Sequence, residues 1–234
     1  LKKLSFLDMS DNQLDALPPE IGQLRNLREL NLSNNFLANL PDEIFHLHNL
    51  TKLSLQSNRF IQLPEKIAGW DSLRELDLSF NDLASLPEKI RGWASLRKLN
   101  LSFNNLTALP DNIGDLTNLV ELNLYSNQIA SLPTSLQKLP NLKKLDLRDN
   151  PIEGVPPEVL EHVDQPAVIL RSYFARGRKP LNECKLILVG QGSVGKTSLA
   201  KRILFDTYDP QQNMTDGIAI SHWYIENPSA TGKQ

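Results

Sequence analysis

A stretch near the C-terminus has the residue types and the spacing of a phosphate-binding loop. It fits the pattern G-x-x-x-x-G-K-[ST], in which the glycines let backbone N–H groups converge on phosphate oxygens. The lysine adds a positive charge at the β- and γ-phosphates, and the hydroxyl that follows it coordinates Mg²⁺. The predicted nucleotide-binding residues are Gly190, Gln191, Gly192, Ser193, Val194, Gly195, Lys196, Thr197 and Ser198.

The elements that must position this loop can be recognised on both sides of it. Residues 184–189 form a short apolar run typical of a buried strand, and residues 198–205 have the apolar spacing of a helix. A phosphate loop requires this order of strand, loop and helix, because the phosphates lie at the helix N-terminus. Cys184 is the chain's single cysteine, which excludes a disulfide framework and any multi-cysteine metal site.

A second threonine, Thr215, lies 18 residues beyond Thr197 and opens the sequence Thr215-Asp216-Gly217. The small GTPases of the Ras-like superfamily carry a similar Thr-x-Gly in switch I. This resemblance implies that Thr215 completes the Mg²⁺ shell and senses the γ-phosphate, so that Thr197 and Thr215 are the metal ligands. It also implies GTP and Mg²⁺ as cofactors, although guanine over adenine rests on the resemblance alone. The catalytic residue that positions water stays unknown.

The part of the chain before this site is a repeat with a period of 23 residues. Around each repeated asparagine the pattern is L-x-x-L-x-L-x-x-N-x-L, and a proline recurs with the same period, which excludes an array of helices. The sequence resembles the leucine-rich-repeat family over residues 1–160. The asparagines are Asn12, Asn35, Asn58, Asn81, Asn104, Asn127 and Asn150. The prolines are Pro18, Pro41, Pro64, Pro87, Pro110, Pro133 and Pro156.

The predicted fold class is α/β: a leucine-rich-repeat solenoid with seven parallel strands, followed by the N-terminal part of a P-loop GTPase domain. The resemblance implies that each asparagine faces inward, where its amide satisfies backbone groups of the turn after the strand. Replacing Asn81 by leucine should then destabilise the array. Segments such as 86–90 should fill the convex side, and Trp70 and Trp93, which stand where other copies have leucine, are interpreted as core residues.

Two columns of side chains on the expected inner wall could recognise a partner. The first alternates in charge, which favours a solvated ladder that supports strand register over a site for a charged ligand. The second contains Phe80 and Phe103, with Tyr125 one position earlier in the next copy. These three aromatics could anchor a protein partner on the concave repeat surface, or could pack against one another and the loop edge. The charged column is Glu29, Lys52, Glu75, Lys98, Glu121 and Lys144.

A helix is expected to follow the repeats and to shield the last copy. Residues 158–176 have helical spacing at Ala167, Leu170 and Phe174, with Pro166 in the first turn. Asp164 or Gln165 could cap its start, and Gly177 would end it. The linker that continues from it is locally basic, which is read as a solvated linker, with a docking surface as the alternative.

In this sequence the repeats come before the phosphate loop, and this order is informative. Together with the run 181–190, the order of the two parts resembles the Roco family, which joins leucine-rich repeats to a Ras-of-complex (Roc) GTPase domain and a COR dimerisation domain. The resemblance implies a leucine-rich-repeat domain over 1–160, a capping helix and linker over 161–182, and the N-terminal part of a Roc domain over 183–234. The parent protein would then be a GTP-binding and GTP-hydrolysing switch, with a dimer as an option through a domain outside this sequence.

Composition narrows the classes of partner. The formal charge is −2, which gives no reason to expect nucleic acid, and no apolar run approaches the ~18 residues that a membrane helix needs. The phosphate loop and the single cysteine favour a cytoplasmic protein.

Both ends of the sequence look cut, since it opens inside a repeat and shows no N-K-x-D motif. Little or no hydrolysis is therefore expected from the chain alone, and measurable turnover that is lost in Lys196→Ala would contradict this. The alternative function is a leucine-rich-repeat binding module whose phosphate loop is structural or takes ATP.

Overall fold

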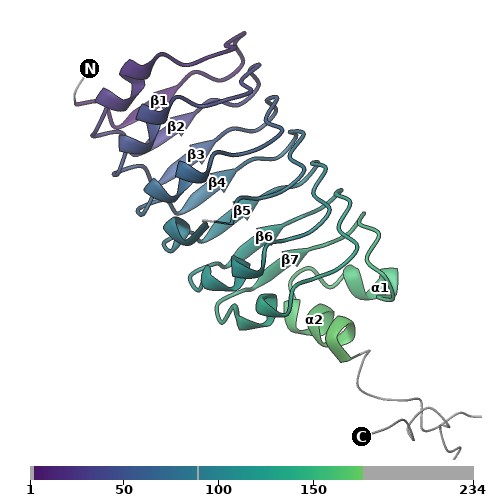
Figure 1. The fold of residues 1–234 in the computed structure, drawn as a ribbon. Helices are drawn as coiled ribbons and strands as arrows, with labels where there is room; N and C mark the ends of the chain where they lie inside the picture. The colour runs from purple at the N-terminus through teal and green to yellow at the C-terminus, as the bar shows by residue number, and fades with distance from the viewer. Residues whose placement is uncertain (1–2, 89, 176–234) are drawn as a thin grey trace, which may run out of the picture. The chain divides into compact units, whose positions relative to one another are not determined.

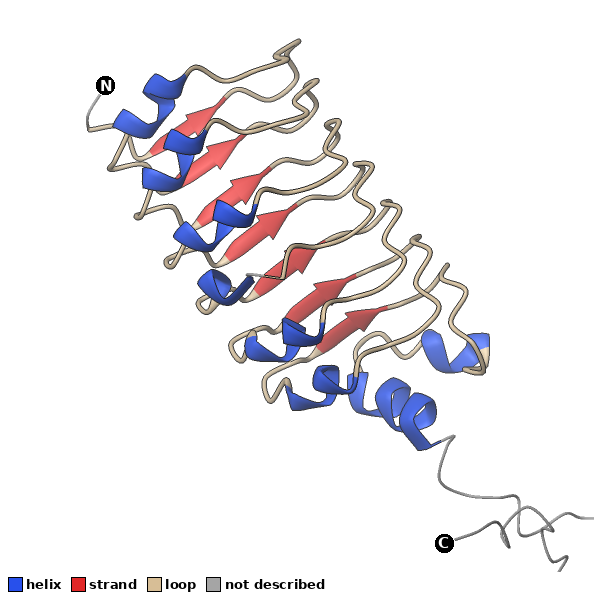
Figure 2. Cartoon of the chain, in the orientation of Figure 1, coloured by secondary structure: helices blue, strands red, loops and turns tan. Residues whose placement is uncertain are grey.

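The computed structural model describes residues 3–88 and 90–175, which belong to the compact unit Leu1–Ala175. Within it, short strands succeed one another along one face, and short 3₁₀ helices succeed one another along the opposite face (Figures 1 and 2). Each copy of the repeat therefore contributes one strand and one return segment to a two-layered unit. The predicted phosphate loop and Thr215 lie outside the described residues.

The strands form one seven-stranded sheet in the order β1-β2-β3-β4-β5-β6-β7, and each neighbouring pair is parallel. The register repeats in step with the sequence, so that Leu30 faces Leu53 and Leu53 faces Leu76. The sequence prediction of a parallel leucine-rich-repeat sheet is confirmed. The strands are β1 (Phe6–Asp8), β2 (Glu29–Asn31), β3 (Lys52–Ser54), β4 (Glu75–Asp77), β5 (Lys98–Asn100), β6 (Glu121–Asn123) and β7 (Lys144–Asp146).

The return segments contain 3₁₀ helices because a proline fixes the backbone just before each of several of them. Pro18, Pro41 and Pro110 have φ near −70° and an extended ψ, and the carbonyl of Pro18 accepts the first helical hydrogen bond from the N–H of Ile21. The helices are η1 (Pro19–Gln23), η2 (Asp42–His46), η3 (Glu65–Gly69), η4 (Ile90–Trp93), η5 (Asp111–Asp115) and η6 (Thr134–Lys138).

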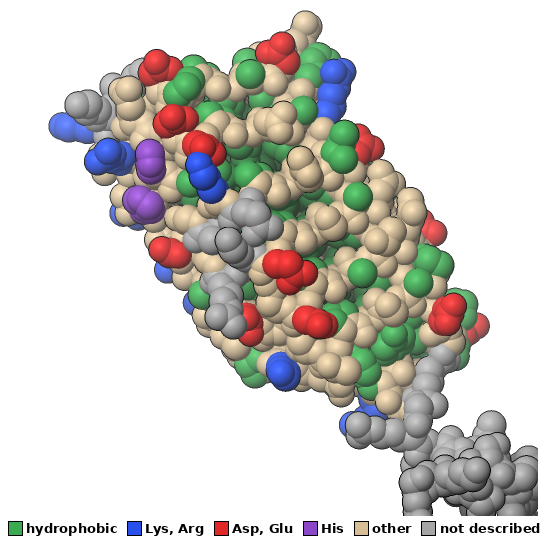
Figure 3. All heavy atoms as spheres, in the orientation of Figure 1, with side chains coloured by type: hydrophobic (Ala, Val, Ile, Leu, Met, Phe, Trp, Pro, Cys, Tyr) green, Lys and Arg blue, Asp and Glu red, His purple; other side chains and the backbone are tan. Residues whose placement is uncertain are grey.

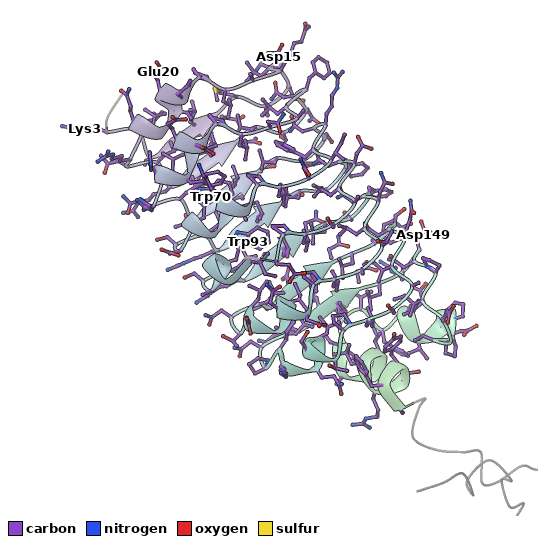
Figure 4. The ribbon with its side chains drawn as sticks, in the orientation of Figure 1. Lys3, Asp15, Glu20, Trp70, Trp93 and Asp149 are labelled. Atoms are coloured by element: carbon purple, nitrogen blue, oxygen red, sulfur yellow. The ribbon has the colours of Figure 1, made fainter. Side chains whose placement is uncertain are left out.

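The core lies between the two layers, and the two tryptophans are part of it, as predicted. Trp70 and Trp93 are fully buried on the helical side of the unit (Figure 4). Each indole N–H donates to a backbone carbonyl of the preceding copy, that of Ile44 for Trp70 (3.3 Å) and that of Ile67 for Trp93 (3.2 Å). The ring of Phe45 packs against Trp70 with centroids 4.9 Å apart, so the bulk of the indole fills space between copies.

The repeated asparagines form the polar spine of the array, which confirms the role implied by the family resemblance. The Asn81 amide donates to the carbonyls of Leu55 (3.0 Å), Leu78 (3.1 Å) and Ser79 (3.2 Å). Its Oδ1 accepts from the N–H of Phe60 in the previous copy (3.0 Å). Asn81 is only 7% exposed, so one side chain satisfies four backbone groups that water does not reach.

Two helices follow the last copy, α1 (Pro157–Leu160) and α2 (Pro166–Phe174). The predicted start with Pro166 in the first turn is confirmed for α2, whereas the helical pattern over 158–176 did not predict that α1 is separate. The interruption comes directly before Pro166, because proline disfavours helical backbone in the preceding residue. Gln165 accordingly has φ −130° and ψ 65°, and its side chain makes no capping hydrogen bond. Helix α2 thus begins with a proline in its first turn and lacks the predicted side-chain cap.

The predicted shielding of the last copy is present, although with a different set of residues. Pro166 and Ile169 are buried, and Leu170, Tyr173 and Phe174 pack against the core, whereas Ala167, although it lies in the predicted helix, is exposed. The Tyr173 hydroxyl accepts a hydrogen bond from the N–H of Leu132 (2.9 Å). The segment between the helices also covers the sheet edge, since the N–H of Leu145 in β7 donates to Val163 (2.9 Å).

Candidate functional site

One turn of every repeat has a left-handed backbone, and this turn positions the aromatic residues singled out from the sequence. The residue before each asparagine has φ between 52° and 57°. A left-handed residue is strained unless it is glycine or a short polar residue that bonds locally. Polar residues occupy five of the copies, but Phe80 (φ 55°) and Phe103 (φ 53°) occupy the other two. The five are Asp11, Asn34, Ser57, Ser126 and Asp149.

The aromatic side chains form a continuous row across three copies, which we call the aromatic row: Phe80, Phe103 and Tyr125. The rings of Phe80 and Phe103 are stacked, with centroids 4.2 Å apart and an interplanar angle of 15°. Tyr125 meets Phe103 edge to face at 5.2 Å. Phe80 remains 47% exposed and Phe103 41%, so packing within the row leaves much of both rings open to solvent.

Arg148 extends the aromatic row into the next copy, and the sequence analysis did not identify it. Its guanidinium carbon lies 5.6 Å from the centre of the Tyr125 ring. Asp146 holds it in a two-point contact, through Nε to Oδ1 (3.0 Å) and Nη2 to Oδ2 (2.7 Å), and Glu161 accepts from Nη1 (3.2 Å). The signal was available, because Arg148 stands in the same repeat position as Tyr125.

The electrostatic state of Arg148 follows from these contacts. The hydrogen bonds and the negative charge of Asp146 raise the pKa of the Arg148 guanidinium above its usual value, with a smaller contribution from Glu161. The group is therefore a permanent cation whose charge is compensated by two carboxylates. It lies over the ring of Tyr125 and offers little net positive charge to a ligand.

Two pairs of neighbours in the alternating charged column form ion pairs across the sheet, as the register predicts. Glu75 faces Lys52 and Lys98 on the neighbouring strands, and Lys52 reaches Glu75 with 3.7 Å between Nζ and Oε2. Lys98 and Glu121 are separated by the same distance. These side chains are largely solvated, so each pair contributes at most about 1 kcal/mol. The contacts fit a ladder that supports register better than a site for a charged ligand.

Carboxylates that no cation pairs remain beside the aromatic row. Among the residues that the structure describes, Asp77 accepts hydrogen bonds from the neutral groups of Ser79 and Asn100 and has no ion pair. Within residues 3–88 and 90–175, neither Asp82 nor Asp149 has an ion pair. Hydrophobic and acidic side chains lie along the edge of the molecule where the loops after the strands lie, and a Lys or Arg side chain stands toward the N-terminal end of this edge (Figure 3). Among the described residues, the carboxylates without an ion pair that stand near the row form what we call its negative rim: Asp77, Asp82 and Asp149.

A separate aromatic contact, which was also not predicted from the sequence, lies nearer the N-terminus. The guanidinium of Arg59 covers the ring of Phe36 at 4.3 Å from its centroid. Phe36 is 41% exposed, as much as Phe103, but its face is already occupied by a cation from this chain. Phe36 therefore serves as an internal comparison for the aromatic row.

The nucleotide-binding and metal-binding predictions fall on residues that the structure does not describe. They are Gly190, Gln191, Gly192, Ser193, Val194, Gly195, Lys196, Thr197, Ser198 and Thr215. Among residues 3–88 and 90–175, no group of three or more His, Cys, Asp or Glu could hold a metal ion. In the same part of the chain, no helix has the length and apolar character needed to cross a membrane.

Comparison with known families agrees with the order of domains. Residues 1–108 match the leucine-rich repeat region, residues 94–152 match the leucine rich repeat, and residues 185–234 match the Ras of Complex, Roc, domain of DAPkinase. The chain thus consists of leucine-rich repeats followed by the beginning of a Roc domain, a small-GTPase-like domain. This is the Roco-type arrangement, as the sequence resemblance implied.

Similar solved structures include one leucine-rich-repeat protein and two receptors. A leucine-rich-repeat protein of Leptospira interrogans is 43% identical, with a TM-score of 0.61 over 64% of this chain and 38% of that chain. The plant peptide hormone receptor RGFR1, in complex with RGF2, is 31% identical, with a TM-score of 0.55 over 62% of this chain and 24% of the receptor.

A TDR receptor is also 31% identical, with a TM-score of 0.59 over 66% of this chain and 28% of that chain. The chain therefore spans less than two fifths of the length of each of these three structures. Among curated proteins, none matched this sequence.

Proposed function

We propose that the parent protein is a GTP-binding and GTP-hydrolysing regulatory switch of Roco type, in which the leucine-rich repeats bind a protein partner. One observation carries the nucleotide part of this proposal. The Roc match begins at Lys185 and contains the complete G-x-x-x-x-G-K-[ST] sequence from Gly190 to Thr197. A chance match to that pattern would not be expected to fall inside a GTPase family model.

The donor set fits a nucleotide with its metal. Lys196 would place its ammonium at the β- and γ-phosphates, and backbone N–H groups of the glycine-rich loop would bind phosphate oxygens. Hydroxyl oxygens of Thr197 and Thr215 are ligands of the kind that Mg²⁺ takes. In this proposal Thr215 responds to the γ-phosphate, so that hydrolysis changes the state of its segment.

Nucleotide titration of the intact parent tests the proposal. With Mg²⁺ present, we expect GTP to bind more tightly than ATP, and Lys196→Ala to abolish binding while thermal unfolding of the repeats stays unchanged. Equal binding of GTP and ATP, or binding that survives Lys196→Ala, would overturn the switch and favour a binding module with a structural or ATP-type loop. A cytoplasmic location and a dimeric parent belong to the same proposal, and size measurement of the intact protein checks the latter.

A further inference from the structure

The two phenylalanines of the aromatic row occupy a position that the repeat itself gives to polar residues. Phe80 and Phe103 each carry the unfavourable left-handed backbone, which costs on the order of 1 kcal/mol for a residue of this kind. Asn34 and Ser57 meet the same requirement in the preceding copies without an apolar ring. The requirements of the fold therefore do not explain why phenylalanine stands here.

Burial does not explain them either. Phe80 and Phe103 are about half exposed, and neither belongs to the hydrophobic core or to the residues packed against it. The two rings stack on each other and Phe103 meets Tyr125 edge to face, which gathers the exposed apolar surface into one place. Clustered, exposed aromatics beside a polar surface are typical anchors of protein interfaces.

The charges around the row indicate which partner it would accept. Several cations near the strands already pair with carboxylates of this chain: Lys98 with Glu121, Lys144 with Asp164, and Arg148 with Asp146 and Glu161. Lys52 is held by Glu75 in the same way. The carboxylates without a cation lie close to the row in sequence, with Asp77 three residues before Phe80 and Asp82 two residues after it.

We propose that the aromatic row binds an extended segment of another protein in which a large apolar side chain lies beside a lysine or arginine. The apolar side chain covers the exposed faces of Phe80 and Phe103, and the cation pairs with Asp77 or Asp82. This inference rests on the protein-binding part of the proposed function and specifies its partner. It is independent of the nucleotide site.

The same charges disfavour two other occupants. A second copy that presented this surface to itself would bring the carboxylates Asp77, Asp82 and Asp149 of both molecules together. Like charges across an interface are repulsive, and the paired cations leave little charge to offset them. An acidic segment would meet the same negative rim.

Selection from a random dodecapeptide library displayed on phage, with the chain 1–234 as bait, tests the proposal. The double variant Phe80→Asn/Phe103→Asn is the second bait, because asparagine already stands at this position in another copy as Asn34. The control is Phe36→Gln, a change at an equally exposed ring outside the row. Synthetic versions of the selected peptides are then titrated against all three proteins.

We expect the selected peptides to place an aromatic or large aliphatic residue next to lysine or arginine. Their dissociation constants should rise at least about tenfold in the double variant and stay unchanged in Phe36→Gln. The unfolding midpoint of the double variant should be unchanged or raised, because relief of backbone strain offsets the lost ring stacking.

Several results would overturn the proposal. These are the absence of any selected sequence class, selection of acidic peptides, or equal binding by the double variant. Dimerisation of the chain that is lost in the double variant would assign the row to a second copy. A clear loss of stability in the double variant would show that the row serves the fold. None of these results bears on GTP titration of the parent, so the proposed switch stands or fails separately.

Discussion

Phe80 and Phe103 stack with ring centroids 4.2 Å apart, although the backbone of each residue is left-handed. Two sets of hydrogen bonds in the turn hold both residues in this conformation. The N–H of Phe80 donates to the carbonyl of Ser102 (3.0 Å), and the N–H of Phe103 donates to that of Tyr125 (2.8 Å). The next residue in each copy is a buried asparagine, Asn81 or Asn104, that binds the turn carbonyls. The backbone of the repeat thus aligns the side chains at the position before each asparagine, whatever their type.

The asparagine spine predicts that replacing its asparagine lowers the free energy of unfolding much more in an inner copy than at the end of the array. Asn81→Leu removes an acceptor for the N–H of Phe60 and a donor to three carbonyls, all in a buried place. We expect a loss of about 3 kcal/mol in the free energy of unfolding, because buried unsatisfied groups cost ~1–3 kcal/mol each and leucine recovers part of this. Chemical denaturation of the two proteins measures it.

Asn12→Leu is the matched control for Asn81→Leu. Asn12 is exposed, and its amide donates only to the nearby carbonyls of Met9 and Ser10. Water can replace these bonds, so the loss should stay below about 1 kcal/mol. Similar losses at both positions would mean that the spine contributes through local turn geometry rather than through buried hydrogen bonds.

The sequence was sufficient for the architecture of the repeats because the same information occurs in every copy. A single strand of three residues such as Leu53 and its neighbours could not be assigned with confidence, but seven strands in phase define register, sheet and core together. Trp70 and Trp93 could be placed because they occupy a position whose role other copies reveal. Periodicity turned weak local signals into a firm prediction.

The sequence was insufficient where a residue has no counterpart in other copies. The separation of α1 from α2 and the exposure of Ala167 depend on how these helices meet the end of the array. The left-handed backbone at Phe80 could not be inferred from phenylalanine, which avoids it, although the aspartates, asparagine and serines of the same column favour it. Arg148 was missed because it has a charged side chain where the preceding copy has the ring of Tyr125, although both stand at the same repeat position.

Close stacking of the 3₁₀ helices predicts that Gly114 cannot be replaced. A Cβ added there would lie 2.5 Å from the carbonyl oxygen of Ser135 and 2.9 Å from its Cβ. Because the obstacle includes backbone of the next copy, we expect Gly114→Ala to lower the free energy of unfolding by about 2 kcal/mol. Thermal and urea unfolding measure the change.

Gly69→Ala is the comparison for Gly114→Ala, since its nearest neighbours, in Phe45, would lie 3.3 Å from the new Cβ. A small adjustment relieves that contact, so the loss should be below about 1 kcal/mol. If Gly114→Ala were as mild as Gly69→Ala, the copies would have room to slide apart, and the tight stacking described for η5 and η6 would not hold in solution.

The hydroxyl of Tyr173 makes a bond that predicts how firmly α2 is held on the last copies. It accepts from the N–H of Leu132, and Tyr173→Phe leaves this amide without its partner in a partly buried place. We expect a loss of about 1 kcal/mol in the free energy of unfolding and faster hydrogen exchange at the amide of Leu132. Tyr125→Phe is the control, because the Tyr125 hydroxyl makes no hydrogen bond with any described residue, and neither quantity should change there. Unchanged exchange at Leu132 in Tyr173→Phe would show that apolar packing of Ile169 and Leu170 alone holds the helix, and that the tyrosine contributes its ring and not its hydroxyl.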